Sequence, residues 1–91
     1  MLIFRTTNLF KKDFRKDQKR GKDVERLRGL MRSLANEATL PARHRDHALT
    51  GNYKGRRECH IEPDWLLVYK VDRKAREIIF ERTGTHSDLF G

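Results

Sequence analysis

The spacing of apolar residues changes along the chain. In the first half they recur every three or four positions, as in a helix, and in the second half they form short runs typical of strands. Residues 2–6 are mostly apolar and favour a strand. Asn8 is suited to cap the helix that follows. Between Leu9 and Lys19, Phe10 and Phe14 lie four positions apart and cations fill most other positions. This pattern predicts an amphipathic helix.

A second helix has the clearest pattern in the sequence. Gly21 is expected to end the first helix, and Asp23 can cap the next one. Its apolar positions follow the i, i+3, i+4, i+7 rule and are Val24, Leu27, Leu30, Met31, Leu34, Ala35 and Ala38. Because the connection between the two helices is so short, we expect an antiparallel helix hairpin.

The second half predicts strands. Pro41 ends helical order, and the polar stretch that follows, with Gly51 and Gly55, is expected to be a loop. Three strands are predicted at residues 53–61, 65–71 and 76–83, and their short connections favour an antiparallel meander. The last residues, GTHSDLFG, are expected to form a single turn.

This order of elements predicts one α+β domain over residues 1–91. An N-terminal strand and a helix hairpin precede a three-stranded antiparallel meander, so the helices should pack on one face of a twisted sheet. The other face is then free to carry a functional site.

Composition and charge narrow the possible partners. Charged residues make up 37% of the chain and the formal net charge is +8, which favours nucleic acid, an acidic protein or an anionic membrane surface. A single cysteine, Cys59, excludes a disulfide framework and fits a reducing cytoplasm. The sequence shows no signal peptide and no apolar run near the roughly 20 residues that span a membrane.

The predicted strand at 53–61 separates its side chains into two sets. One face carries Arg57, Cys59 and Ile61, and the other carries Arg56, Glu58 and His60. Adjacent Cys59 and His60 should point to opposite faces, and no histidine has a recognised zinc spacing. We therefore expect no metal site and no cofactor.

Histidines from three segments can meet on the open face. His47 precedes the strand and His86 lies near the C-terminus, so a meander could bring both close to His60, Glu58 and Asp64. An ordinary surface or core role remains the alternative for each of them. Histidine exchanges protons near neutral pH, and RNA carries its own nucleophile in the 2′-hydroxyl. A histidine pair with nearby cations could therefore cleave RNA without a metal.

Three segments, RDHALTGNYKG, RRECHIEPDWLLVYK and FERTGTHSDLFG, resemble the YafQ-type toxins of the RelE/ParE superfamily. The resemblance implies a RelE-like fold and a bacterial, cytoplasmic toxin of a type II toxin–antitoxin system. Such toxins cleave messenger RNA in the ribosome without a metal. The 2′-hydroxyl attacks the adjacent phosphate and leaves a cyclic phosphate and a free 5′-hydroxyl. The implied partners are the ribosome, messenger RNA and a cognate antitoxin, and operator DNA is bound only through the antitoxin complex.

The resemblance also assigns roles to individual residues. The catalytic positions would be His47, His60, Asp64 and His86, with Trp65 and Phe90 in support. The chain departs from the family at Glu58, where Asp is common, and at Arg56, where an aromatic is familiar.

Several of these positions have alternative interpretations. Trp65 could stack on RNA bases, shape the site or lie in the core. Phe90 could attach the tail, and Asp64 could be a turn residue. The cations of the first helix could attach the protein to ribosomal RNA or form a solvated face. They are Lys11, Lys12, Arg15, Lys16 and Lys19.

Two other functions remain possible. The first is a non-catalytic toxin of the same fold that binds DNA gyrase, which would not need the gathered histidines. The second is a plain nucleic-acid-binding module, although no usual base-reading helix motif is present.

Overall fold

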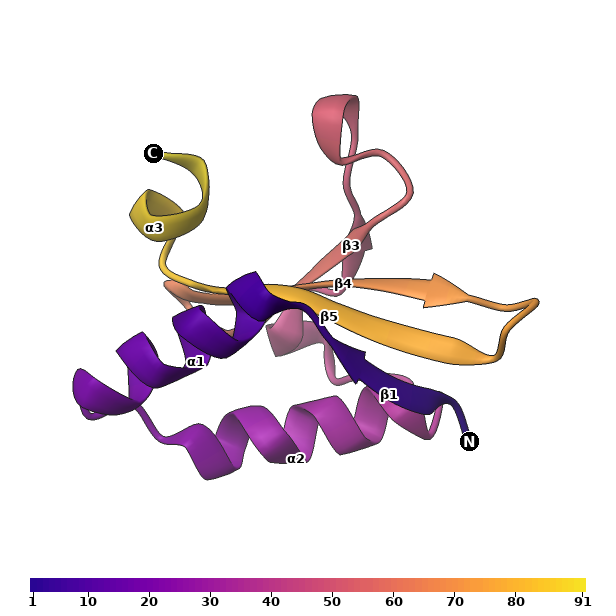
Figure 1. The fold of residues 1–91 in the computed structure, drawn as a ribbon, viewed down its shortest axis with the longest axis horizontal. Helices are drawn as coiled ribbons and strands as arrows, with labels where there is room; N and C mark the ends of the chain where they lie inside the picture. The colour runs from indigo at the N-terminus through magenta and orange to yellow at the C-terminus, as the bar shows by residue number, and fades with distance from the viewer.

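A twisted five-stranded sheet carries helices α1 (Asn8–Lys19) and α2 (Val24–Ala35) on one face (Figure 1). The computed structural model describes residues 1–91. The strand order is β1-β5-β4-β3-β2; β1 runs parallel to β5 and the other neighbours are antiparallel. The strands are β1 Ile3–Thr6, β2 His47–Ala48, β3 Arg57–Glu62, β4 Trp65–Asp72 and β5 Glu77–Gly84. The predicted α+β fold and its antiparallel meander, β3-β4-β5, are confirmed.

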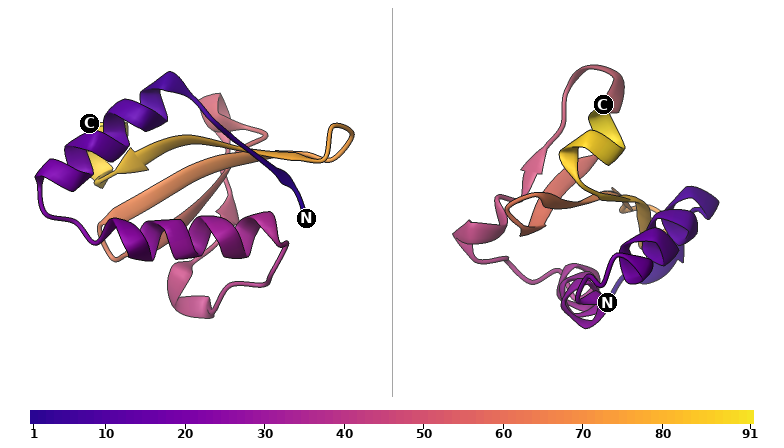
Figure 2. Two further views of the ribbon diagram at one scale, coloured as in Figure 1. Left: turned by 60° about the horizontal axis from the view of Figure 1, so that its bottom comes forward. Right: turned by 90° about the vertical axis from the view of Figure 1, so that its left-hand side faces the viewer.

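The helices are α1 Asn8–Lys19, α2 Val24–Ala35 and the short α3 His86–Phe90, and two 3-10 turns, η1 Ala42–His44 and η2 Gly51–Tyr53, lie between α2 and β3. Figures 1 and 2 show α1 and α2 running in opposite directions, as the predicted hairpin requires. None of these helices combines the length and apolar character needed to cross a membrane.

The helix ends follow from capping side chains. Thr7, not Asn8, is the N-cap of α1, because its hydroxyl accepts a hydrogen bond of 3.0 Å from the Phe10 backbone N–H. The same hydroxyl donates to the Glu81 carbonyl, which fixes the start of α1 against β5. Asp23 caps α2, as predicted, by accepting from the Arg26 N–H at 3.3 Å.

The second helix ends at Ala35 rather than Ala38. Glu37 adopts a left-handed backbone with φ of 60°, and the Ala38 N–H turns back to the Ser33 carbonyl. This is the hydrogen-bond pattern of a Schellman C-terminus, which stops the helix despite an apolar residue in phase with it.

The strand predictions are corrected at one edge of the sheet. β3 begins at Arg57 rather than residue 53, because Gly51–Tyr53 forms a 3-10 turn and Gly55 has φ of 90°. Within the segment expected to be a loop, His47–Ala48 forms the edge strand β2. β4 and β5 lie within one residue of their predicted bounds.

The core forms between the sheet and the helix hairpin. Cys59 and Ile61 are buried there with residues such as Leu27, Leu34 and Phe80, as the strand alternation predicted. Burial raises the pKa of the Cys59 thiol well above its ordinary value, which keeps it protonated and unreactive. A smaller cluster of Leu66, Val68 and Leu89 lies apart from this core and involves α3.

Trp65 belongs to the main core, between the sheet and the helix hairpin. Its side chain is completely buried, and its indole N–H donates to Asp17 Oδ2 at 2.9 Å and to Thr83 Oγ1 at 3.1 Å. Burial raises the pKa of the Asp17 carboxyl, and the hydrogen bonds from Trp65 and Thr83 partly oppose that shift. The suggested stacking of Trp65 on RNA bases is therefore wrong, since no face of the ring is accessible.

Replacing Trp65 by Phe should destabilise the fold. The change removes the donor to a buried carboxylate and should lower the free energy of unfolding by about 1–3 kcal/mol. Urea unfolding followed by circular dichroism measures the loss. A variant with unchanged stability and a specific defect in RNA binding would contradict the core role.

Candidate active site

The short helix α3 partly covers the face of the sheet that was expected to be free. Figure 1 and the right-hand view in Figure 2 show α3 on the side opposite α1 and α2, together with the segment around Gly51–Tyr53. Leu89 of α3 packs on Leu66 and Val68. The ring of Phe90 meets Tyr53 edge-on, with centroids 5.3 Å apart.

Glu58 lies between two imidazoles. His47 is the direct cross-strand partner of Glu58 in the β2–β3 pair, and His60 follows Glu58 on the same face of β3. Glu58 Oε1 is 3.6 Å from His47 Nε2 and 3.7 Å from His60 Nε2. The carboxyl is buried, whereas about half of the His47 side chain is exposed. Glu58 therefore contacts both imidazoles from the buried side and helps to fix their orientation.

Asp64 holds the third imidazole. Asp64 Oδ1 accepts hydrogen bonds from the His86 backbone N–H at 3.0 Å and from His86 Nδ1 at 2.6 Å. These hydrogen bonds hold the pKa of the Asp64 carboxyl below its ordinary value, which keeps it ionised and able to accept. The rings of His86 and His60 lie 5.8 Å apart between centroids. The structure thus brings together all the residues that the family resemblance named as catalytic.

All three imidazoles bond to an oxygen through Nδ1, while Nε2 of His47 and of His60 faces Glu58. His47 Nδ1 donates to the Arg45 carbonyl at 2.6 Å, and His60 Nδ1 donates to the Pro63 carbonyl at 3.1 Å. His86 Nδ1 bonds to Asp64 in the same way. A carbonyl or carboxylate oxygen can only accept, so Nδ1 carries the proton in each ring. Nε2 is then the atom available for proton transfer.

The supporting positions have different environments. Arg56 precedes β3 and forms a salt bridge with Glu81 of β5, so its guanidinium is already paired. Phe90 remains 44% exposed beside Tyr53, which places two aromatic rings at the end of α3.

The basic residues of α1 form a second surface. Five cations surround an open pocket of about 390 Å³ and are Lys12, Arg15, Lys16, Lys19 and Arg20. Lys11 is exposed on the same helix but does not line this pocket. Lys16 and Arg20 also contact Asp88 of α3, so the basic surface adjoins the helix that carries His86.

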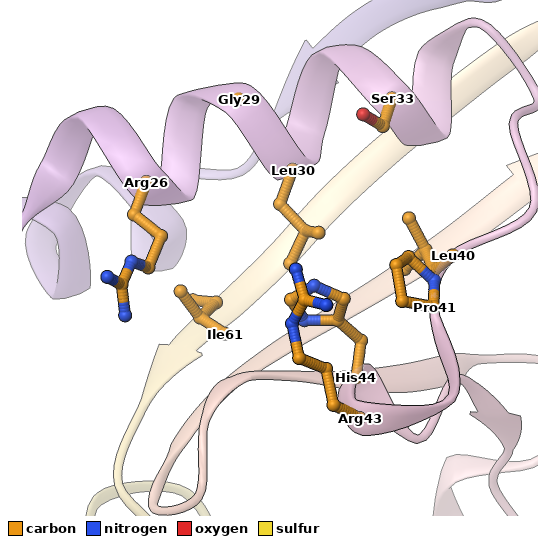
Figure 3. Close-up of a pocket in the computed structure, with 9 residues that line it drawn as sticks. All are labelled: Arg26, Gly29, Leu30, Ser33, Leu40, Pro41, Arg43, His44 and Ile61. Carbon is orange, nitrogen blue, oxygen red and sulfur yellow. The ribbon is translucent and has the colours of Figure 1, made fainter.

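Sequence reasoning gave no role to His44, which supports the site from the helix side. Its Nδ1 donates to the backbone carbonyl of His60 at 2.7 Å and so fixes the strand beneath that imidazole. His44 lines a separate pocket of about 540 Å³ between α2 and the segment that follows it, with Leu30, Leu40 and Ile61 (Figure 3). No sequence signal links His44 to β3, because the contact depends on the fold of the η1 turn.

Comparisons with known proteins show the family of this chain. The profile of a family described as "Bacterial toxin of type II toxin-antitoxin system, YafQ" matches residues 2–91. The mRNA interferase toxin YafQ of Escherichia coli K12 is 49% identical over 83 residues, which cover 90% of this chain and 88% of that protein.

Solved structures give the same result. A chain in the crystal structure of the E. coli DinJ–YafQ complex matches with a TM-score of 0.90 at 43% identity, over 100% of both chains. A metal-bound toxin from Helicobacter pylori matches with a TM-score of 0.93 at 39% identity, over 99% of this chain and 100% of that one. On the family match and the extent of these similarities, the protein belongs to the YafQ family of bacterial type II toxin–antitoxin toxins.

Proposed function

We propose that this toxin is a ribosome-dependent endoribonuclease that cleaves messenger RNA without a metal ion. The main support is the gathering of His47, His60 and His86, each with Nδ1 bonded to an oxygen. Proton exchange then falls to Nε2, which lies beside Glu58 in His47 and His60 and has no such partner in His86. The E. coli relative named as an mRNA interferase supports the same activity.

In the proposed reaction the nucleophile belongs to the RNA. One imidazole Nε2 takes the proton of the 2′-hydroxyl as its oxygen attacks the adjacent phosphorus. A second imidazole, protonated on both nitrogens before the reaction, gives its Nε2 proton to the 5′-oxygen as the bond between that oxygen and phosphorus breaks. The products are a 2′,3′-cyclic phosphate and a free 5′-hydroxyl. A protonated imidazole also stabilises the charge that develops on the phosphate oxygens.

His86 and Asp64 form the best oriented pair for one of these transfers. The carboxylate fixes both the backbone and the ring of His86, and it stabilises the imidazolium that forms when Nε2 takes a proton. His60 lies next to His86, so two proton-transferring groups are within reach of one phosphate. Glu58 has a supporting role, because it contacts His47 and His60 from the buried side.

The partners follow from family and charge. The E. coli relative has been solved in complex with DinJ, and we propose that a cognate antitoxin likewise binds and suppresses this toxin. A segment with acidic residues would suit a chain with net charge +8. Operator DNA would be reached through that complex, while the cations of α1 would contact ribosomal RNA.

Changing His86 to Ala should abolish message cleavage while the protein stays folded. Loss of one proton-transferring group should slow cleavage by about 100-fold or more. The measurement is end-mapping of a defined message in a bacterial translation extract.

His44→Asn is the matched control, because the asparagine Nδ2 takes the place of His44 Nδ1 and can still donate to the His60 carbonyl, and the His44 side chain lies outside the histidine cluster. It should cut the message at the same positions as the wild type. An intact message with the wild-type protein would overturn the enzyme function and direct attention to gyrase binding. Normal cleavage by folded His86→Ala would exclude only the role of His86.

The basic surface of α1 should govern ribosome association. Changing Lys12 and Lys19 together to Ala removes two cations of the pocket that form no ion pair in the structure. The slope of log affinity against log salt should become shallower by about 0.7 for each lost phosphate contact. Ribosome pelleting at several salt concentrations measures this slope.

Lys70→Ala with Lys74→Ala provides the control, since both exposed lysines lie toward the far end of the β4–β5 hairpin (Figure 1). Equal slopes for the two double variants would show that net charge, rather than the α1 surface, determines binding.

A further inference from the structure

The position of His86 depends on a helix that cannot hold itself in place. α3 has five residues, and isolated helices shorter than about 12 residues are marginal in water. Leu89 and Phe90 attach the second half of α3 to the sheet and to Tyr53. Other contacts must therefore fix the first turn, where His86 lies.

Asp88 makes those contacts within the turn. The Thr85 hydroxyl accepts from the Asp88 N–H at 3.1 Å, and Asp88 Oδ2 accepts from the Thr85 N–H at 3.0 Å, which completes a capping box. A Cβ at Gly84 would lie 2.9 Å from Asp88 Cβ and Oδ2, so the glycine allows this close approach.

The same carboxylate also connects α3 to α1. Arg20 donates from Nη1 to Asp88 Oδ2 at 2.6 Å and from Nη2 to Oδ1 at 3.1 Å, and Lys16 Nζ donates to Oδ1 at 3.3 Å. A two-pronged contact between Arg and a carboxylate fixes direction as well as distance. The hydrogen bonds from Arg20 and from the Thr85 backbone hold the pKa of Asp88 far below its ordinary value, so the carboxylate stays charged.

We propose that Asp88 is a positioning residue for His86, which it fixes by clamping α3 to Arg20 and Lys16 of α1. This inference rests on the proposed ribonuclease activity for its kinetic consequence. Asp64 holds the backbone N–H and the imidazole of His86 from the β3–β4 turn, whereas Asp88 fixes the first turn of α3 against Arg20 and Lys16. Asp64 thus connects α3 to the β3–β4 turn, and Asp88 connects α3 to α1.

Arg20→Gln tests the clamp from the α1 side, because it leaves the capping box of α3 intact. A displaced His86 should lower the maximal single-turnover rate at saturating ribosomes by about 10-fold or more. Lys19→Gln is the matched control: it removes a charge from the same pocket without contacting Asp88, and it should act on the half-saturating ribosome concentration. Arg20→Lys should recover part of the rate.

A double-mutant cycle separates the clamp from a general loss of stability. If Asp88 acts through Arg20, Asp88→Asn combined with Arg20→Gln should be no slower than Asp88→Asn alone. Independent, multiplying effects would contradict the proposal. An Arg20→Gln defect confined to the half-saturating concentration would also overturn it.

A second readout does not depend on cleavage. In folded Arg20→Gln, the amides of residues 86–91 should exchange hydrogen faster than in the wild type, and the imidazole signals of His86 should shift in NMR spectra. If hydrogen exchange and the His86 signals stay unchanged, Asp88 only caps α3, and the proposed clamp is wrong. If the wild-type protein cleaves no message, the proposed function fails, and these spectra still decide whether the clamp exists.

Discussion

The buried carboxylate of Glu58 is the contact around which the candidate site is arranged. A buried acid needs partners, because an unpaired charge in the interior is costly. The partners of Glu58 are His47, directly across the β2–β3 pair, and His60, its neighbour on the same face of β3. The opposite face of β3 places Cys59 and Ile61 in the main core. A one-residue slip of this strand would exchange the two sets and destroy both core and site.

The candidate site is supported from several sides. His44 fixes the backbone at His60 from the helix side of the sheet. Asp64 in the β3–β4 turn fixes His86, and Asp88 connects the same short helix to α1. Each of the three candidate rings bonds to an oxygen through Nδ1, so the fold sets the tautomer as well as the position. The basic helix α1 then contributes both the surface that we propose for RNA and an anchor for α3.

Much of the fold could be predicted because its signals are local. The helical spacing of Leu27, Leu30 and Leu34 and the alternation in β3 both reflect burial on one side. The separation of Glu58 and His60 from Cys59 followed from that alternation alone. The strand β2 was missed because two residues are too few to show any period.

The rest depends on contacts between distant residues. Trp65 begins an apolar strand in either interpretation, and what decides for the core is its complete burial together with its hydrogen bond to Asp17, 48 positions away. Asp88 and Arg20 are 68 positions apart, and nothing near either residue indicates the pair. Supporting contacts of this kind become visible only when the chain is folded.

The most direct test of the account concerns the nucleophile. A ribosome complex would be programmed with a message that carries one 2′-deoxynucleotide immediately 5′ of a mapped cleavage position. If histidines transfer protons to and from the RNA's own hydroxyl, cleavage at that position should disappear while the unmodified message is still cut there. Unchanged cleavage of the deoxy-substituted message would contradict the mechanism, because another nucleophile would then attack the phosphate.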